Sequence, residues 1–164
     1  MMNSINLENT YTSLPQEFFR YTEAETMPDV NVITINEQLA DLLNIDIGFL
    51  KSQSGLRFLS GKNSKILPNS ISLAYAGHQF GHLVPQLGDG RAVLLGDKIC
   101  QDGVRRDIQL KGSGKTYFSR GGDGRAGIGP VIREYLISES MHHLGVPTTR
   151  SVSYTHLTLP TTLS

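Results

Sequence analysis

The sequence predicts an α+β fold, in which an antiparallel sheet is followed by one long helix. Two apolar segments, residues 91–99 and 104–110, are separated by a Gln-Asp-Gly turn at 101–103, and they read as neighbouring strands. A helix is expected from about Pro130 to Leu144, because proline suits the first helical position and Gly145 follows the last turn. Strand, turn, strand, loop and long helix is the order typical of an α+β lobe.

A shorter strand and helix are expected nearer the N-terminus. Residues 31–36 alternate as a short strand, and Asn36 is suited to cap the helix that follows. That helix would carry its apolar residues at Leu39, Leu42 and Leu43.

Composition is that of a globular protein. Of 164 residues, 38% are hydrophobic and 18% are charged, without a low-complexity segment. The longest apolar runs, such as residues 92–96, are far shorter than the roughly 20 residues of a membrane span, and no secretory signal pattern opens the sequence. The single cysteine, Cys100, excludes an internal disulfide. We expect a cytoplasmic protein in which this thiol is structural.

Positive charge and glycine are concentrated in the middle of the sequence. Residues 1–50 contain eight acidic side chains against one arginine, whereas residues 51–133 contain thirteen Lys and Arg against five Asp. Thirteen of the seventeen glycines lie between Gly77 and Gly129. A positive, glycine-rich segment suits a polyanion such as a nucleoside triphosphate. Attraction between two oppositely charged halves of the fold would explain the same charges.

Residues 112–116, Gly-Ser-Gly-Lys-Thr, follow a predicted strand and resemble a Walker-type phosphate loop. The complete pattern needs another glycine where this sequence has Gln109, and a helix that begins at Lys115. The pair Gly121-Gly122 would break such a helix within its second turn. A P-loop-type NTPase is therefore the alternative rather than the preferred interpretation.

The arrangement of a kinase-like nucleotide site fits better. Such a site needs, in chain order, a glycine loop between strands, a Lys at the end of the next strand, and a Glu on the following helix. The sequence supplies Gly-Asp-Gly-Arg at 88–91, then Lys111, then Glu134. Glycine lets the backbone approach phosphate, while Arg91 and Lys111 neutralise its charge. Glu134 would orient Lys111 and is expected to face the protein interior.

Each of these features also has an ordinary explanation. Residues 88–91 could form a simple hairpin turn, Lys111 could end a strand in solvent, and Glu134 could be an acid favoured near a helix N-terminus. A kinase-like fold that serves as a non-catalytic nucleotide-binding module is a further alternative. The motif Gly-Asp-Gly-Arg-Ala recurs at 122–126, which we interpret as one loop solution used twice.

Two histidines are candidate metal ligands by their spacing. His78 and His82 have the spacing of a helical zinc motif. The residues between them lack the glutamate of that motif and disfavour a helix, so no metal site is expected here.

Six longer motifs are more specific. They are Ala-Gly-His-Gln-Phe-Gly at 76–81, Pro-Gln-Leu-Gly-Asp-Gly-Arg at 85–91, Leu-Lys-Gly-Ser-Gly at 110–114, Ser-Arg-x-Gly-Asp-Gly-Arg-Ala at 119–126, Arg-Glu-Tyr at 133–135 and Gly-Val-Pro-Thr-Thr-Arg at 145–150. Together they resemble the selenoprotein O family, from about residue 10 to Ser151. The resemblance implies the N-terminal portion of a protein-kinase-like fold.

The resemblance also implies an activity, which is the transfer of AMP from ATP to Ser, Thr or Tyr hydroxyls of proteins, with Mg²⁺ or Mn²⁺. It implies no nucleic-acid or membrane partner. ATP contacts are implied at Gly88, Gly90, Arg91, Lys111, Asp123 and Gly124. Glu134 would pair with Lys111. The catalytic Asp and the metal ligands are implied to lie beyond Ser151, so the chain by itself is expected to be inactive.

Three parts of the chain are expected. Residues 1–75 would form an N-terminal extension that packs on an incomplete kinase-like lobe, residues 76–151. Residues 152–164 resemble the translated end of a transposon used in sequencing libraries, and we interpret them as a sequencing-adapter artefact. A genuine strand is the alternative, because Val152 and Tyr154 alternate acceptably.

Overall fold

The computed structural model describes residues 5–25, 30–62, 69–79 and 81–157. The strands are β1 (Phe19–Tyr21), β2 (Val30–Ile35), β3 (Ile71–Leu73), β4 (Gly77–Gln79), β5 (His82–Val84), β6 (Ala92–Ile99), β7 (Arg105–Lys111) and β8 (Ser153–Leu157). The α-helices are α1 (Glu37–Leu42), α2 (Ile47–Leu50), α3 (Gln53–Leu59) and α4 (Ile128–His143), and two 3-10 helices span Thr10–Ser13 and Gln16–Phe18. None of the helices in these ranges combines the length and apolar character needed to cross a membrane.

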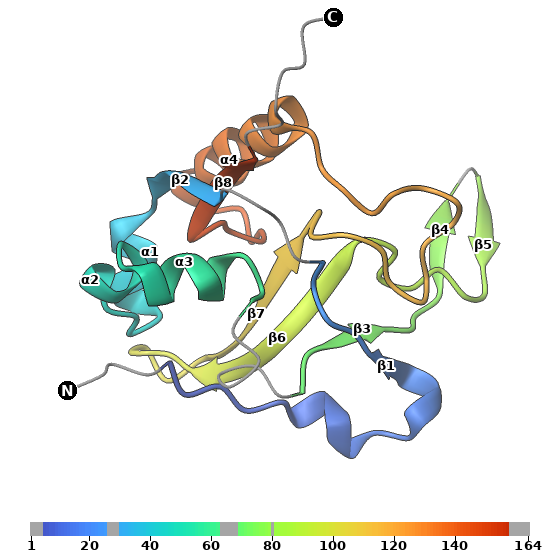
Figure 1. Cartoon of the computed structure of the whole chain (residues 1–164). Coiled ribbons are helices and arrows are strands. Elements are labelled where there is room, and N and C mark those ends of the chain that lie inside the picture. The colour runs from blue at the N-terminus through green and yellow to red at the C-terminus, as the bar shows by residue number, and fades with distance from the viewer. Residues whose placement is uncertain (1–4, 26–29, 63–68, 80, 158–164) are drawn as a thin grey trace, which may run out of the picture.

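The main sheet has the strand order β1-β3-β6-β7, with antiparallel neighbours throughout (Figure 1). Its longest pairing joins β6 to β7, from Ala92 opposite Lys111 to Ile99 opposite Arg105. The predicted α+β combination of an antiparallel sheet and a long helix is therefore confirmed. Strands β1 and β3 come from residues 1–75, so the expected boundary after residue 75 crosses this sheet. The division into an extension and a lobe stays a prediction.

Alternation along β6 gives the sheet two buried faces, because successive side chains of a strand point in opposite directions. Leu94 packs on one side with Phe19 and Ile71 from β1 and β3. On the other side, residues of β6 pack against the three short helices seen in Figure 1. The main members of this second cluster are Leu39, Leu43, Leu50, Phe58, Val93 and Leu95.

The helix ends follow recognisable capping rules. The Asn36 side chain accepts a hydrogen bond from the Leu39 backbone N–H (3.0 Å), so the predicted cap of α1 is confirmed. Helix α4 begins at Ile128, two residues before the predicted start, and Pro130 is its third residue. Proline is tolerated there because the first-turn N–H groups have no partner within the helix. The predicted end is confirmed, with Gly145 in the left-handed region (φ 76°).

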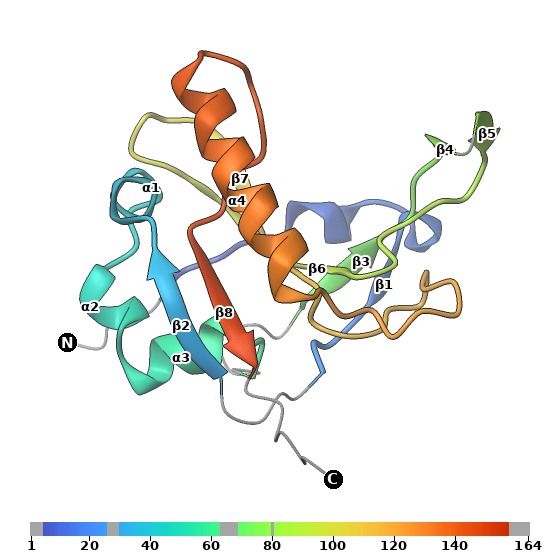
Figure 2. The ribbon, with the colours of Figure 1, turned by 90° about the horizontal axis from the view of Figure 1, so that it is seen from above.

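Strand β8 pairs antiparallel with β2, and the resulting ribbon lies beside α4 (Figure 2). Residues 153–157 thus form a strand, which was the alternative to the interpretation of this segment as an adapter artefact. Val152 packs against the larger core cluster, and the ring of Tyr154 lies 5.3 Å from that of Tyr135 on α4. The artefact interpretation concerns the origin of these residues and stays a prediction, while residues 158–164 lie outside the described ranges.

A nearly buried ion pair ties α4 to this ribbon. Arg150 donates to both carboxylate oxygens of Glu139, at 2.8 and 2.7 Å, and the Asn36 amide donates to the same carboxylate at 2.8 Å. Only 13% of the Arg150 side chain and 16% of the Glu139 side chain are exposed. The hydrogen bonds from Arg150 hold the pKa of Glu139 below its ordinary value, against the opposing effect of burial.

The lowered pKa of Glu139 predicts a measurable acid sensitivity. A carboxyl whose pKa is lower in the folded state adds stability above its unfolded pKa of about 4.3, and this stability is lost as the pH falls through the folded value. The free energy of unfolding, measured with urea, should therefore fall less steeply between about pH 5 and pH 3 in Glu139→Gln than in the parent. Glu17→Gln, which removes an exposed carboxylate, should keep the parent slope, and equal slopes in all three proteins would contradict the prediction.

A second charged cluster fixes the N-terminal segment to the sheet. Asp97 on β6 is fully buried, and one of its oxygens accepts from the backbone N–H and the hydroxyl of Thr10, both at 2.8 Å. Its other oxygen accepts from Arg105, which also pairs with Glu8 at 2.7 Å. Backbone hydrogen bonds between Glu8 and Asp97, at 2.9 and 2.8 Å, extend the pairing. Gly96 permits this approach, since a Cβ there would lie 2.3 Å from the Glu8 carbonyl oxygen.

Candidate nucleotide-binding site

The predicted nucleotide residues lie where β6 begins and β7 ends. Lys111 is the last residue of β7 and stands opposite Ala92. The Gly112 N–H donates to the Arg91 carbonyl at 2.7 Å, which places Arg91, the residue before β6, beside the end of β7. Both side chains are exposed, so two cations are available at one end of the sheet.

The ion pair predicted between Lys111 and Glu134 is present. The Lys111 ammonium lies 2.7 Å from a carboxylate oxygen of Glu134 on α4. The expectation that Glu134 faces the interior is wrong, because 46% of its side chain is exposed. Ser138 is the one buried residue of α4 (6% exposed), so the helix buries little of its surface and this pair stays at the rim. The contact is confirmed, whereas its role towards a nucleotide stays a prediction.

The first glycine loop, residues 88–90, is held from both sides by close packing. Gly88 adopts a positive φ of 67°, and a Cβ there would lie 2.5 Å from the Phe118 ring. Within the loop, the Asp89 side chain accepts from the Leu73 backbone N–H at 3.0 Å. Burial raises the pKa of Asp89, although the hydrogen bonds it accepts from Leu73 and Tyr75 oppose that effect. Asp89 therefore anchors the loop to β3.

The second glycine loop, which we call the 112–126 loop, folds back on itself as two arms. Ser113 on the first arm forms an isolated bridge with Arg125 on the second, and the Gly114 N–H donates to the Gly124 carbonyl at 3.2 Å. A Cβ on Gly124, which has a φ of 70°, would lie 2.0 Å from the Gly114 carbonyl oxygen, so only glycine fits. On the second arm, Asp123 accepts from the Arg125 N–H at 3.0 Å, which makes a local turn.

No helix begins at Lys115, since the residues after it form a turn at Tyr117 and Phe118. A Walker-type loop needs a helix N-terminus at this point, facing the phosphates. The P-loop-type alternative for residues 112–116 is therefore wrong, for the reason that Gly121-Gly122 suggested.

The tip of the 112–126 loop covers the first glycine loop. Ser119 donates from its hydroxyl to the Gly90 carbonyl at 2.5 Å, and the Thr116 hydroxyl donates to the Asp89 carbonyl. The base of the loop is directly continuous with Lys111, and the space above Gly112 is filled by Ala126. The structure thus connects both Gly-Asp-Gly-Arg segments to the end of β7. That they line a single nucleotide surface stays a prediction.

Glu25 is a participant that the sequence did not indicate. Its carboxylate accepts from the Lys115 backbone N–H at 3.1 Å and from the Arg125 guanidinium at 3.2 Å. Its own backbone N–H donates to the Ser113 carbonyl at 2.8 Å. The Lys115 N–H first, and Arg125 second, hold the pKa of Glu25 below its ordinary value. No local pattern marks a contact across about 90 residues of chain.

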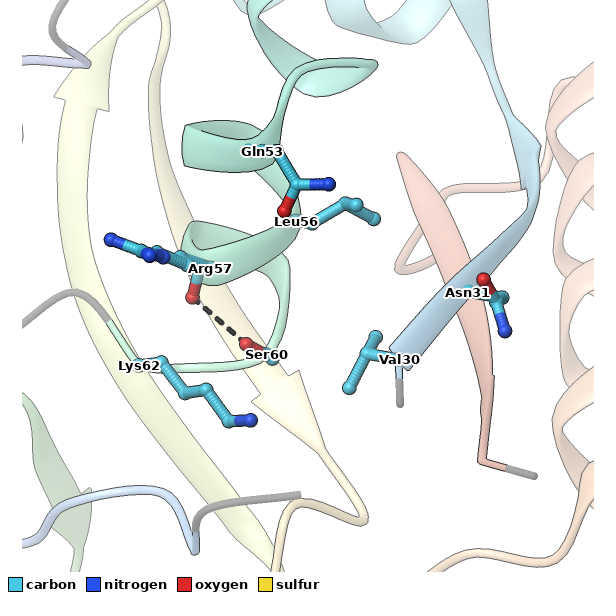
Figure 3. Close-up of a pocket in the computed structure, with 7 residues that line it drawn as sticks. All are labelled: Val30, Asn31, Gln53, Leu56, Arg57, Ser60 and Lys62. Atoms are coloured by element: carbon cyan, nitrogen blue, oxygen red, sulfur yellow. Dashed lines mark hydrogen bonds between the residues drawn. The ribbon is translucent and has the colours of Figure 1, made fainter. Parts of the chain in front are cut away.

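Two cavities lie at different distances from these loops. The smaller, about 180 Å³, is lined by Gln86, Leu87 and residues 117–120, next to the first glycine loop. The larger, about 580 Å³, lies between α3 and β2, where Leu56 and Val30 extend into the space and the Arg57 guanidinium points away from β2 (Figure 3). The larger cavity shares no lining residue with the predicted site. The smaller cavity adjoins the first glycine loop.

The described side chains do not form a metal centre. His78 and His82 lie on β4 and β5 rather than on a helix. Within the ranges that the structure describes, no three His, Cys, Asp or Glu side chains converge as metal ligands. Cys100 is buried in the larger core cluster, in keeping with a structural thiol.

Comparison with known proteins identifies the family. The sequence model of the protein adenylyltransferase SelO family matches residues 1–161. A relative named protein nucleotidyltransferase YdiU from Alkalilimnicola ehrlichii is 54% identical over 146 residues, which cover 89% of this chain and 30% of the relative. Proteins of the same name from Clostridium botulinum and Bradyrhizobium diazoefficiens are each 53% identical, over 92% and 89% of this chain and 30% of each relative. The chain spans about 30% of the length of these curated relatives. It belongs to the protein adenylyltransferase SelO family.

Proposed function

We propose that the chain forms part of the ATP site of a protein adenylyltransferase, which transfers AMP from ATP to Ser, Thr or Tyr hydroxyls of other proteins. The observation that carries this proposal is the 2.7 Å pair between Lys111 at the end of β7 and Glu134 on α4. A glycine loop, a strand-end Lys and a helix Glu occur here in the order that a kinase-like nucleotide lobe requires. Family membership supports the reaction class.

Six residues would contact ATP, as the resemblance to the family implies. Gly88 and Gly90 would let the backbone approach the ligand, while Arg91 and Lys111 would supply positive charge beside it. Asp123 and Gly124 would contact ATP from the second arm of the 112–126 loop. Glu134 would keep the Lys111 ammonium aimed at phosphate by a charge-assisted hydrogen bond. These roles are predictions.

A divalent metal, Mg²⁺ or Mn²⁺, is implied by the family and does not fit the described residues, whose acidic side chains do not converge. Asp89 is occupied by β3, and Asp123 by its own turn. We further propose that the 164 residues alone do not catalyse the transfer of AMP. The cytoplasmic location expected from the sequence stays a prediction.

The position of a radioactive label in ATP separates the proposed reaction from its alternatives. A protein extended to the length of its relatives should transfer label from the α-phosphate of ATP to an acceptor protein, and no label from the γ-phosphate, in the presence of Mg²⁺ or Mn²⁺. Transfer of the γ-label would indicate an ordinary kinase. Binding of ATP without transfer of either label would favour the non-catalytic nucleotide-binding module.

A further inference from the structure

We infer that Glu25 positions the nucleotide-binding part of the 112–126 loop by holding its two arms together. This inference rests on the proposed function, since it concerns the loop that carries Asp123 and Gly124. Glu25 lies outside every residue set implied by the sequence motifs, and it approaches the loop from the N-terminal part of the chain.

The contacts of Glu25 divide between the two arms. One carboxylate oxygen accepts from the Lys115 N–H on the first arm (3.1 Å), and the other accepts from the Arg125 guanidinium on the second (3.2 Å). The Glu25 backbone N–H donates to Ser113, also on the first arm (2.8 Å). A single residue therefore forms three hydrogen bonds that close the loop from outside.

The loop depends on this closure because its internal pairing is sparse. Among the described residues, the backbone pairing between the arms is one isolated bridge, Ser113 to Arg125, with its 3.2 Å hydrogen bond from the Gly114 N–H to the Gly124 carbonyl. Glu25 also packs against Gly114, where a Cβ would lie 2.3 Å from the glutamate side chain. Gly114 and Gly124 give the backbone of both arms more conformational freedom than other residues would. The hydrogen bonds to the Glu25 carboxylate restrict that freedom.

The position of Arg125 connects this clamp to the nucleotide residues. Asp123 accepts from the Arg125 backbone N–H at 3.0 Å, so the turn that presents Asp123 and Gly124 ends at the residue that Glu25 holds. Without the carboxylate, the Arg125 side chain would lose its ion pair, and the second arm would be held by its backbone alone. A carboxylate in an ordinary surface ion pair would contact Arg125 alone. Glu25 is different, because it also accepts from the Lys115 N–H and donates from its backbone N–H to the Ser113 carbonyl.

Amide hydrogen exchange measured by NMR on the 164-residue chain tests the clamp without any nucleotide. In Glu25→Ala, the amides of Gly114 and Lys115 should exchange about three- to ten-fold faster, while amides of β6 keep their rates. Glu25→Gln keeps one acceptor for the Lys115 N–H and should fall between Ala and the parent. Glu23→Gln, which removes an exposed carboxylate two residues earlier, should match the parent. Unchanged exchange in Glu25→Ala overturns the inference.

Titration with ATP, followed through the Gly124 amide signal, tests the positioning role in a protein extended to the length of its relatives and carrying the same substitutions. Weaker ATP binding by about three- to five-fold in Glu25→Ala, at unchanged global stability, supports it. Faster loop exchange with an unchanged dissociation constant limits Glu25 to a structural role and overturns positioning. If the extended parent gives no ATP response while the exchange rates of the 164-residue variants change, the proposed ATP site fails and the clamp itself stands.

Discussion

Replacing Lys111 with alanine is expected to lower AMP transfer at least about 100-fold in a protein extended to the length of its relatives. The substitution removes the ammonium that Glu134 holds at 2.7 Å, at the end of β7 beside the backbone of Arg91. A preorganised cation acts most strongly on the charge that develops in the transition state. The measurement is the rate of α-label transfer from ATP to an acceptor protein at saturating and limiting ATP.

Lys115→Ala is the matched control for this substitution. Lys115 is an exposed lysine four residues further along, and its backbone N–H, rather than its ammonium, bonds to Glu25. The variant should retain transfer within about three-fold of the parent, because the contact to Glu25 does not use the side chain. Loss of ATP binding in Lys115→Ala with retention in Lys111→Ala would restore the phosphate-loop interpretation and contradict ours.

The parts of the fold that were predicted from sequence are those whose signals are local. Strands β6 and β7 are recognisable because a Gln-Asp-Gly turn separates two apolar segments, and Gly103 there does adopt a positive φ of 77°. The cap of α1 was predicted because Asn36 bonds within three residues of itself. The start of α4 was placed two residues late, since its cap is Gly127, which makes no side-chain hydrogen bond and leaves no signature.

The parts that were missed depend on contacts between distant segments. The order of Lys111 and Glu134 predicted their contact, but the exposure of Glu134 depends on how loosely α4 packs, which periodicity does not encode. Glu25 contacts the 112–126 loop across about 90 residues of chain, and no local sequence pattern around Glu25 or Lys115 marks this contact. Burial of Asp97 was equally hidden, because a charged residue on a strand ordinarily faces solvent.

Asp97→Ala is expected to lower the free energy of unfolding by about 3 kcal/mol. The buried carboxylate satisfies the N–H and hydroxyl of Thr10 and pairs with Arg105, so its removal leaves these donors without their partner and opens a small cavity. The loss of unfolding free energy should lie at the lower end of the range for removing one partner of a buried ion pair. The reason is that 38% of the Arg105 side chain is exposed and Glu8 still contacts it. Urea unfolding of the 164-residue chain at pH 7 measures the difference.

Acid titration of the same variants adds a second measurement on Asp97. Burial by itself raises the pKa of Asp97, but the hydrogen bonds from Thr10 and Arg105 outweigh it, and the pKa lies below its ordinary value. The stability that Asp97 supplies is therefore present above its unfolded pKa of about 3.9 and is lost as the pH falls through the folded value. The difference between parent and Asp97→Ala should accordingly narrow below about pH 4.

Asp107→Asn is the control, because Asp107 stands directly opposite Asp97 in the β6–β7 register and is exposed. Its carboxylate accepts one hydrogen bond, from the Tyr11 hydroxyl at 3.1 Å, which an asparagine oxygen can also accept. This variant should remain within about 0.5 kcal/mol of the parent at pH 7. Equal losses in Asp97→Ala and Asp107→Asn would mean that charge on the sheet, rather than the buried junction with Thr10 and Arg105, determines stability. A loss confined to Asp97→Ala instead assigns the stability to the junction that fixes the N-terminal segment to β6.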